Sequence, residues 1–131
     1  FWRLVASSAS PLLLNEGGVK AGDIGFIAVS MNSQVALGAA WLRLFQPDSP
    51  GYGYLDEETP ELAIAVRPQD RDQGIGTALL TRLLVRAADR YSAVSLSVSI
   101  GNPALRLYRR FGFETVEQTE DSLTMVKILR V

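Results

Sequence analysis

The sequence predicts a single α/β domain built around a mixed sheet. Residues 93–100 alternate apolar residues with serine, which is typical of a strand with one buried face. Residues 67–76 contain a glycine-rich turn between a short apolar run and a segment with helical spacing. The expected elements follow the order strands, helix, strand, helix and strand pair, without an internal repeat. A length of 131 residues fits one domain.

In the first part of the chain we expect a helical segment and two strands. Helical material is predicted within residues 1–14, around Trp2. Apolar runs at residues 24–29 and 35–45, separated by a polar hairpin connection, predict two antiparallel strands. Gly38 lies inside the second run, where it indicates a bulge or the close approach of another segment.

The middle of the chain predicts a loop, a strand and an amphipathic helix. Residues 46–60 are rich in proline and glycine, and loops of this length inside a domain are often functional. Residues 62–66 predict a strand, which Pro68 ends. A helix is predicted from Ile75 to about Arg90. Its buried face is expected to consist of Ile75, Leu79, Leu80, Leu83, Leu84 and Ala87.

The last part predicts a strand, a helix and a strand pair. The buried face of the strand at residues 93–100 is expected to contain Val94, Leu96, Val98 and Ile100. Asn102 can cap the next helix, and Gly112 ends it. Residues 112–117 and 123–130 predict the final pair of strands.

Composition excludes several kinds of chemistry. The chain has no cysteine and no histidine, which removes disulfides, thiolate nucleophiles, imidazole bases and metal sites built from these residues. A net charge of −1 argues against nucleic acid or an anionic membrane as an obligate partner. No apolar run approaches the roughly 20 residues that span a bilayer, and the first residues lack the layout of a signal peptide. We therefore expect a cytoplasmic location and no metal.

The segment from Arg71 to Gly76, Arg-Asp-Gln-Gly-Ile-Gly, carries the strongest functional signal. Gly74 and Gly76 have no Cβ atom, so the backbone can approach a ligand closely. The free N–H groups of the first helical turn favour an anion, and Arg71 adds a positive donor fork. Thr77 stands where a P-loop needs lysine, and Leu79 where a dinucleotide site needs glycine or alanine. The turn therefore predicts a phosphate site of another kind.

This turn resembles the acyl-CoA loop of the Gcn5-related N-acetyltransferase (GNAT) superfamily, whose pattern is Arg/Gln-x-x-Gly-x-Gly/Ala. A second block resembles the late motif of that superfamily, with Asn102 at a helix start, Tyr108 six residues later, and Gly112-Phe113 at the helix end. The resemblance covers roughly residues 22–130. It implies a three-layer domain with a central mixed, mostly antiparallel sheet flanked by helices. The first strand of the superfamily is expected to be missing, because the chain is expected to be N-terminally truncated or short.

The resemblance implies that an acetyl group passes from acetyl-CoA to an amine acceptor. Direct attack is the simplest mechanism, because no cysteine is present to form a covalent intermediate. A backbone N–H near Val66 would hold the oxyanion. The resemblance implies that the cofactor-binding residues are Ala65, Val66, Arg71, Asp72, Gln73, Gly74, Ile75, Gly76, Thr77, Asn102 and Tyr108.

Tyr108 and Glu61 are the candidate catalytic residues. The position of Tyr108 in the late motif implies an acid that stabilises the leaving thiolate, although Tyr108 also belongs to an apolar helical stripe that fits a core. Glu61 is the candidate base, because strand alternation places it on one face with Ala63 and Ala65, which leave open space. The alternative is a solvated Glu61. Other candidate bases, or a solvated acidic rim, are Asp56, Glu57 and Glu58.

Several assignments stay open at this point. Asn102 is either a helix cap or a contact of the pantetheine arm. Arg106 and Arg109 face either the 3′-phosphate of CoA or solvent. An acceptor pocket could include Trp41, Tyr52 and Tyr54, and a core position explains Trp41 equally well. The acceptor is not specified, and a homodimer is one expected state because the superfamily often dimerises. The competing hypothesis is a non-catalytic acyl-CoA-binding or sensing module.

Overall fold

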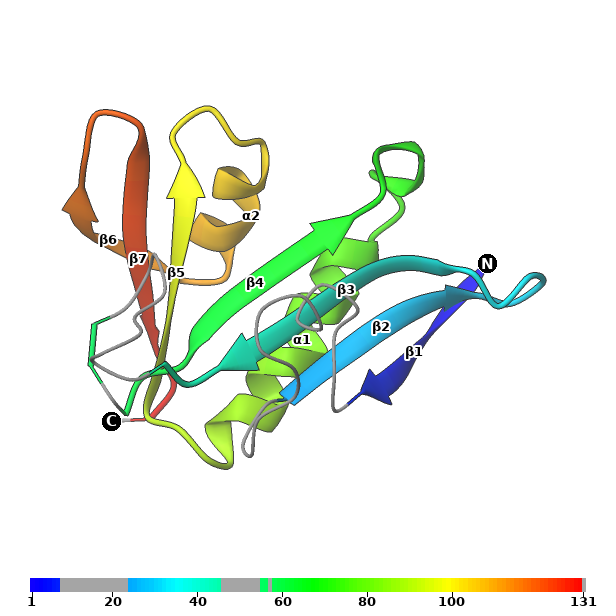
Figure 1. Ribbon diagram of the computed structural model, residues 1–131, viewed down its shortest axis with the longest axis horizontal. Helices are drawn as coiled ribbons and strands as arrows, with labels where there is room; N and C mark the ends of the chain where they lie inside the picture. The colour runs from blue at the N-terminus through cyan, green and yellow to red at the C-terminus, as the bar shows by residue number, and fades with distance from the viewer. Residues whose placement is uncertain (8–23, 46–54, 57, 131) are drawn as a thin grey trace. The chain divides into compact units, whose positions relative to one another are not determined.

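The computed structural model describes all residues except 8–23, 46–54, 57 and 131 (Figure 1). Contacts divide the chain into two compact units. The first unit contains Phe1–Arg43 and Ala63–Arg86, and the second contains Leu44–Leu62 and Ala87–Val131. Within the described residues, seven strands pair in the order β1-β2-β3-β4-β5-β7-β6. Every strand pair with an assigned register is antiparallel except β4 with β5, so the predicted mixed, mostly antiparallel α/β fold is confirmed.

In the first unit, β1 (Trp2–Ser7), β2 (Ile24–Ser30) and β3 (Ala36–Arg43) lie side by side in antiparallel pairs (Figure 1). The next strand in the order is β4 (Glu61–Val66), whose last four residues belong to this unit. The helix α1 (Ile75–Ala88) packs against these strands. The Cζ atom of its Arg82 lies 5.6 Å from the ring centre of Phe26 in β2.

The strand β1 corrects two expectations. The helix expected near Trp2 is absent, because residues Trp2 to Ser7 pair with β2 along their whole length. The chain does have a first strand beside β2, so the expectation that this strand is missing is also wrong. The aromatic and β-branched residues of this segment favour a strand where a neighbouring strand satisfies their backbone groups. The rest of the expected helix lies outside the described residues.

Gly38 has both of the features that the sequence predicted as alternatives. The register of β2 with β3 shifts between Ala28 and Val29, which leaves a bulge beside Gly38. A Cβ atom at Gly38 would lie only 2.9 Å from the carbonyl oxygen of Ala65 and 3.2 Å from a methyl group of Val66. The missing side chain therefore allows the end of β4 to pack closely on β3.

The apolar face predicted for α1 is confirmed. All six of its predicted residues are buried, namely Ile75, Leu79, Leu80, Leu83, Leu84 and Ala87. Burying an aliphatic side chain of this size contributes about 1.5–3 kcal/mol, so this face fixes the helix. Trp41 is only 8% exposed, which makes it a core residue.

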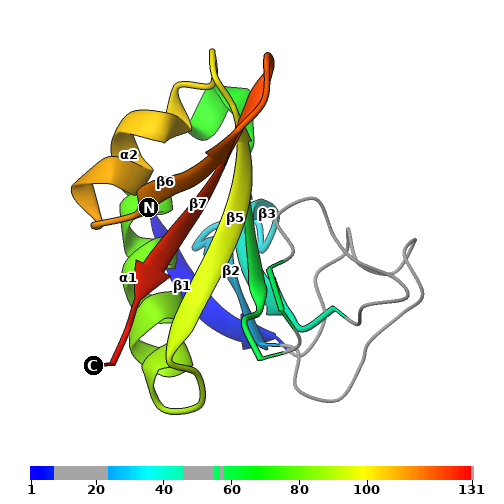
Figure 2. The same cartoon turned by 90° about the vertical axis from the view of Figure 1, so that its left-hand side faces the viewer.

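In the second unit, β7 (Ser122–Ile128) lies between β5 (Ala93–Ser99) and β6 (Glu114–Gln118) and is antiparallel to both. Figure 2 shows the helix α2 (Ala104–Arg110) on one side of these strands. The start of β4 pairs with β5 in parallel, with Glu61 opposite Ser95.

Alternation in β5 is confirmed for three of its four predicted core residues. The three buried residues are Val94, Leu96 and Val98. Ile100 is 42% exposed instead, because the strand ends at Ser99 and the backbone N–H of Ile100 bonds to the carbonyl of Asp121 in a turn. Ser95 on the other face is fully buried.

Candidate functional site

The turn between β4 and α1 is held by backbone hydrogen bonds on its entry side. Arg67 donates its N–H to the carbonyl of Leu37 in β3, at 2.9 Å. A short 3-10 helix, Pro68–Asp70, follows. Asp72 and Gly74 then have positive φ angles of 63° and 82°, a backbone region that favours glycine and tolerates aspartate. The turn therefore reverses the chain immediately before the helix begins.

The start of α1 presents unused hydrogen-bond donors. The carbonyl of Gly74 accepts the first helical bond, from Ala78, at 3.0 Å. Among the described residues, the backbone N–H groups of Gly74, Ile75, Gly76 and Thr77 have no acceptor. This is the normal state of the first four amides of a helix, where the positive end of the helix dipole also lies. The first turn holds no acidic residue, so this end of α1 suits an anionic ligand.

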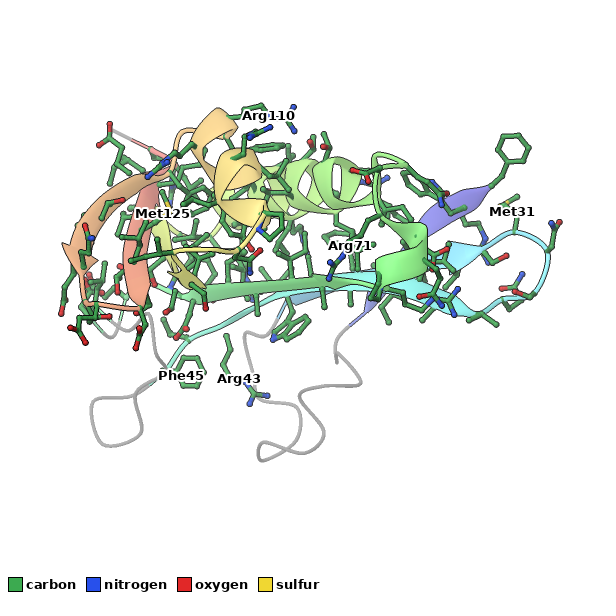
Figure 3. The ribbon with its side chains drawn as sticks, turned by 90° about the horizontal axis from the view of Figure 1, so that it is seen from above. Met31, Arg43, Phe45, Arg71, Arg110 and Met125 are labelled. Carbon is green, nitrogen blue, oxygen red and sulfur yellow. The ribbon has the colours of Figure 1, made fainter. Side chains whose placement is uncertain are left out.

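Arg71 adds a side-chain donor to the turn. Its Nε atom donates to the carbonyl of Val66 at 3.4 Å, and Figure 3 shows the side chain beside the end of β4. The two terminal amino groups of this exposed guanidinium contact no acceptor in the described part of the chain. They remain available for a phosphate, which arginine binds through two parallel hydrogen bonds.

The backbone of Val66 points toward the edge of β4 that faces away from β3. Successive N–H groups of a strand point in opposite directions, and that of Arg67 is directed at Leu37 of β3. The N–H of Val66 is therefore directed at the opposite edge of β4. A donor in this position is of the type that stabilises an oxyanion.

In the second unit, the end of α2 fixes Tyr108. Gly112 has a φ angle of 90°. The N–H of Gly112 bonds to the carbonyl of Arg109, and the N–H of Phe113 bonds to the carbonyl of Tyr108, both at 3.1 Å. This pattern is a Schellman helix ending, which is usually accompanied by an apolar contact between the same two positions. Here that contact joins the rings of Tyr108 and Phe113.

The side chain of Tyr108 is buried, but its hydroxyl has no partner in the described part of the chain. The residue is 6% exposed, and burial raises the pKa of its phenol from 10.0 to about 12. Within the described residues the hydroxyl makes no hydrogen bond. Tyr108 therefore fills a core position and still offers a donor at the end of its ring.

Asn102 caps α2, as one of its two interpretations predicted. Its Oδ1 atom accepts a hydrogen bond from the backbone N–H of Ala104 at 2.8 Å. The side-chain amide donors have no acceptor among the residues that the structure describes. Arg106 and Arg109 are exposed on the outer side of α2.

The candidate bases differ in their surroundings. Glu61 is half-buried at the start of β4, next to Leu62, which is 3% exposed, whereas Ala65 further along is exposed. Asp56 and Glu58 are exposed, and the Asp56 Oδ1 atom accepts a hydrogen bond from the N–H of Glu58 at 2.8 Å. The other loop candidates, Glu57, Tyr52 and Tyr54, lie outside the described residues.

The predicted site residues fall into two groups. The residues from Ala65 to Thr77 come together in the first unit, whereas Glu61, Asn102 and Tyr108 belong to the second. The sequence interpretation missed a pair beside the turn, in which the Arg67 Nε atom lies 2.6 Å from the Asp70 Oδ2 atom. Opposite charges three residues apart were a usable signal for this pair.

No group of three potential metal ligands among histidine, cysteine, aspartate and glutamate comes together within the described residues. No described helix has the length and apolar character of a membrane-spanning segment.

Comparisons with known proteins agree with this arrangement. The family model of the acetyltransferase (GNAT) domain matches residues 16–115. No curated protein matches the chain significantly. Among solved structures, the ribosomal-protein-alanine N-acetyltransferase of Brucella melitensis is 27% identical with a TM-score of 0.63, and the match covers 82% of this chain and 69% of that one.

Two further solved structures are similar in fold. YncA of Salmonella typhimurium, solved with its cofactor acetyl-CoA, is 22% identical with a TM-score of 0.65, over 82% of this chain and 65% of that one. The spermidine/spermine N-acetyltransferase SpeG of Vibrio cholerae is 16% identical with a TM-score of 0.70, over 98% of this chain and 95% of that one. This chain thus spans about two thirds of the length of YncA.

Proposed function

The chain belongs to the GNAT acetyltransferase family, and from this premise we propose that it transfers an acetyl group from acetyl-CoA to an amine acceptor. One observation carries the proposal most directly. The four backbone N–H groups from Gly74 to Thr77 and the two terminal amino groups of Arg71 have no acceptor in the described structure. Donors of this kind at a helix start match the diphosphate of CoA.

The reaction sets three tasks for the protein. The amine must lose a proton, the tetrahedral oxyanion must be held, and the leaving thiolate must be stabilised. We assign the second task to the N–H of Val66, which is directed away from β3. The third task belongs to the hydroxyl of Tyr108.

The raised pKa of Tyr108 limits what this residue can do. A thiol titrates near 8.5, whereas the Tyr108 phenol titrates at about 12. Complete proton transfer from Tyr108 to the thiolate is therefore uphill by roughly 5 kcal/mol, at about 1.36 kcal/mol per pKa unit. Tyr108 acts by donating a hydrogen bond to the sulfur while keeping its proton.

Glu61 is assigned the role of base. Carboxylates are weak bases for an ammonium ion, so a water molecule relays the proton from the amine. The acceptor is an amine, and two similar proteins are named for different acceptors, spermidine and spermine for SpeG and a ribosomal-protein alanine for the Brucella enzyme. A panel of polyamines and peptides with free N-termini covers both.

Titration calorimetry with acetyl-CoA tests the cofactor site. Gly74→Trp places a large side chain at the turn and should abolish saturable binding. Val85→Trp is the matched control, because Val85 is 66% exposed on α1 and can accept a tryptophan without covering the turn. Unchanged binding in Gly74→Trp would remove the turn from the proposal.

A second candidate is a non-catalytic acyl-CoA-binding module. The weakness of the candidate base favours it, since a carboxylate such as that of Glu61 is a poor acceptor for the proton of an ammonium ion. Release of free CoA thiol over the amine panel separates the two candidates. An enzyme releases CoA faster with at least one amine than by hydrolysis alone, whereas a sensor binds acetyl-CoA and leaves that rate unchanged.

A further inference from the structure

Four charged residues surround the proposed diphosphate turn, and their formal charges cancel. The two cations are Arg67 and Arg71, and the two anions are Asp70 and Asp72. The turn therefore has no excess of positive side-chain charge to attract a phosphate. The pairing between these four residues decides which cation is available to a ligand.

Arg67 and Asp70 form a close ion pair. The Arg67 Nε atom lies 2.6 Å from the Asp70 Oδ2 atom, which is the distance of a charge-assisted hydrogen bond. The Asp70 side chain is only 15% exposed, whereas that of Arg67 is 42% exposed. Backbone bonds hold both partners in place, from Arg67 to Leu37 and from Asp70 to Arg67, each at 2.9 Å.

Arg71 directly follows Asp70 in the sequence but does not pair with it. Its Nε atom donates to the carbonyl of Val66 instead. Its terminal amino groups have no acceptor within the described residues. The poorly exposed carboxylate of Asp70 needs a cation, and Arg67 supplies it.

We propose that Arg67 is a positioning residue for the cofactor. Its pairing with Asp70 neutralises the carboxylate beside the turn and keeps that carboxylate from pairing with Arg71. The guanidinium of Arg71 consequently stays available for the diphosphate. This inference rests on the proposed function, because the anion in question is the diphosphate of CoA.

A double-mutant cycle tests the inference, with CoA as the probe in titration calorimetry at low salt. Arg67→Ala leaves Asp70 unneutralised next to Arg71 and should weaken CoA binding by about tenfold, the effect of one uncompensated charge near a surface site. Asp70→Ala removes the competing carboxylate and should leave binding unchanged or tighter. The double variant should return to within about twofold of the wild type.

Four controls separate this role from a structural one. Arg67→Lys keeps the charge and should retain most of the affinity. Arg90→Ala removes an exposed arginine beyond the far end of α1 and should not change CoA binding. In added salt the defect of Arg67→Ala should shrink, because screening weakens the charge of Asp70. Thermal unfolding without CoA should be lowered more by Arg67→Ala than by Asp70→Ala, since only the first leaves a poorly exposed charge without its partner.

The cycle has outcomes that overturn the inference. If Asp70→Ala weakens CoA binding as much as Arg67→Ala does, the ion pair only stabilises the conformation of the turn, and the inference is wrong. If Arg67→Ala binds CoA like the wild type, while Gly74→Trp does not bind it, this inference fails and the proposed function stands. If the wild-type protein binds no CoA, both this inference and the proposed function are wrong.

Discussion

Tyr108 and Phe113 meet edge to face across the end of α2, with ring centroids 5.9 Å apart and ring planes inclined at 63°. Gly112 lies between them in the sequence and ends the helix with a φ angle of 90°. The Gly-Phe pair of the late motif therefore has a physical purpose in this chain. It ends the helix and packs a ring against Tyr108, which limits the directions in which the Tyr108 hydroxyl can point.

Replacing Tyr108 by phenylalanine should separate its two roles. The variant keeps the buried ring and its contact with Phe113, so the free energy of unfolding at pH 7 should change by less than about 0.5 kcal/mol. It loses the hydrogen bond to the sulfur, so kcat should fall about tenfold to a hundredfold, while the dissociation constant of acetyl-CoA stays nearly the same. Thiol-release kinetics and calorimetry measure these quantities, and an unchanged kcat would leave Tyr108 a core residue only.

The buried phenol also predicts a loss of stability at high pH. Between pH 10 and about 12 the unfolded chain releases the Tyr108 proton while the folded chain retains it. Folding is then linked to proton uptake, so the free energy of unfolding falls with rising pH, by up to about 1.4 kcal/mol per pH unit. Urea unfolding at pH 8, 10 and 11 should show a steeper decline for the wild type than for Tyr108→Phe. Parallel curves would contradict the burial of the phenol.

Gly38→Ala should destabilise the protein through β4. The new methyl group would lie 2.9 Å from the Ala65 carbonyl oxygen, which is backbone and cannot move without shifting the strand. Such overpacking costs typically about 1–3 kcal/mol. Urea unfolding measures the loss, and CoA affinity should also fall, because Ala65 and Val66 lead into the turn. Ala39→Gly, at the next position of β3, is a control that adds no atoms and should leave CoA binding intact.

The role of Asn102, as a helix cap or a cofactor contact, can be assigned by comparing two substitutions. Asn102→Ala removes the cap of α2 and should lower the free energy of unfolding by about 1 kcal/mol. Asn102→Asp keeps the oxygen that accepts from Ala104 and should retain the wild-type stability. If Asn102 is only a cap, both variants bind CoA like the wild type in calorimetry. Weaker binding by Asn102→Asp would assign its amide to the cofactor instead.

Local patterns in the sequence were enough to predict several structural elements. The 3.6-residue period identified the buried face of α1, because that period depends only on neighbouring residues. Gly38 stood out because it interrupts an apolar strand. The cap at Asn102 and the ending at Gly112 are likewise set by a few adjacent residues.

Contacts between segments that are distant in the sequence could not be predicted from local patterns. The segment near Trp2 is short enough for either structure, and its pairing with β2 decides in favour of a strand. The end of β5 depends on the bond from Ile100 to Asp121, which lies in a distant turn. The pair of Arg67 with Asp70 forms because the 3-10 helix that begins at Pro68 brings both side chains to one side of the turn.

The position of β7 determines when the sheet of the second unit can be completed during translation. This strand is the last of the described elements, yet it lies between β5 and β6. On a translating ribosome, β5 and β6 wait without their shared neighbour until residues 122–128 have emerged. The sheet of the second unit is therefore completed only after the last of the described strands has been made.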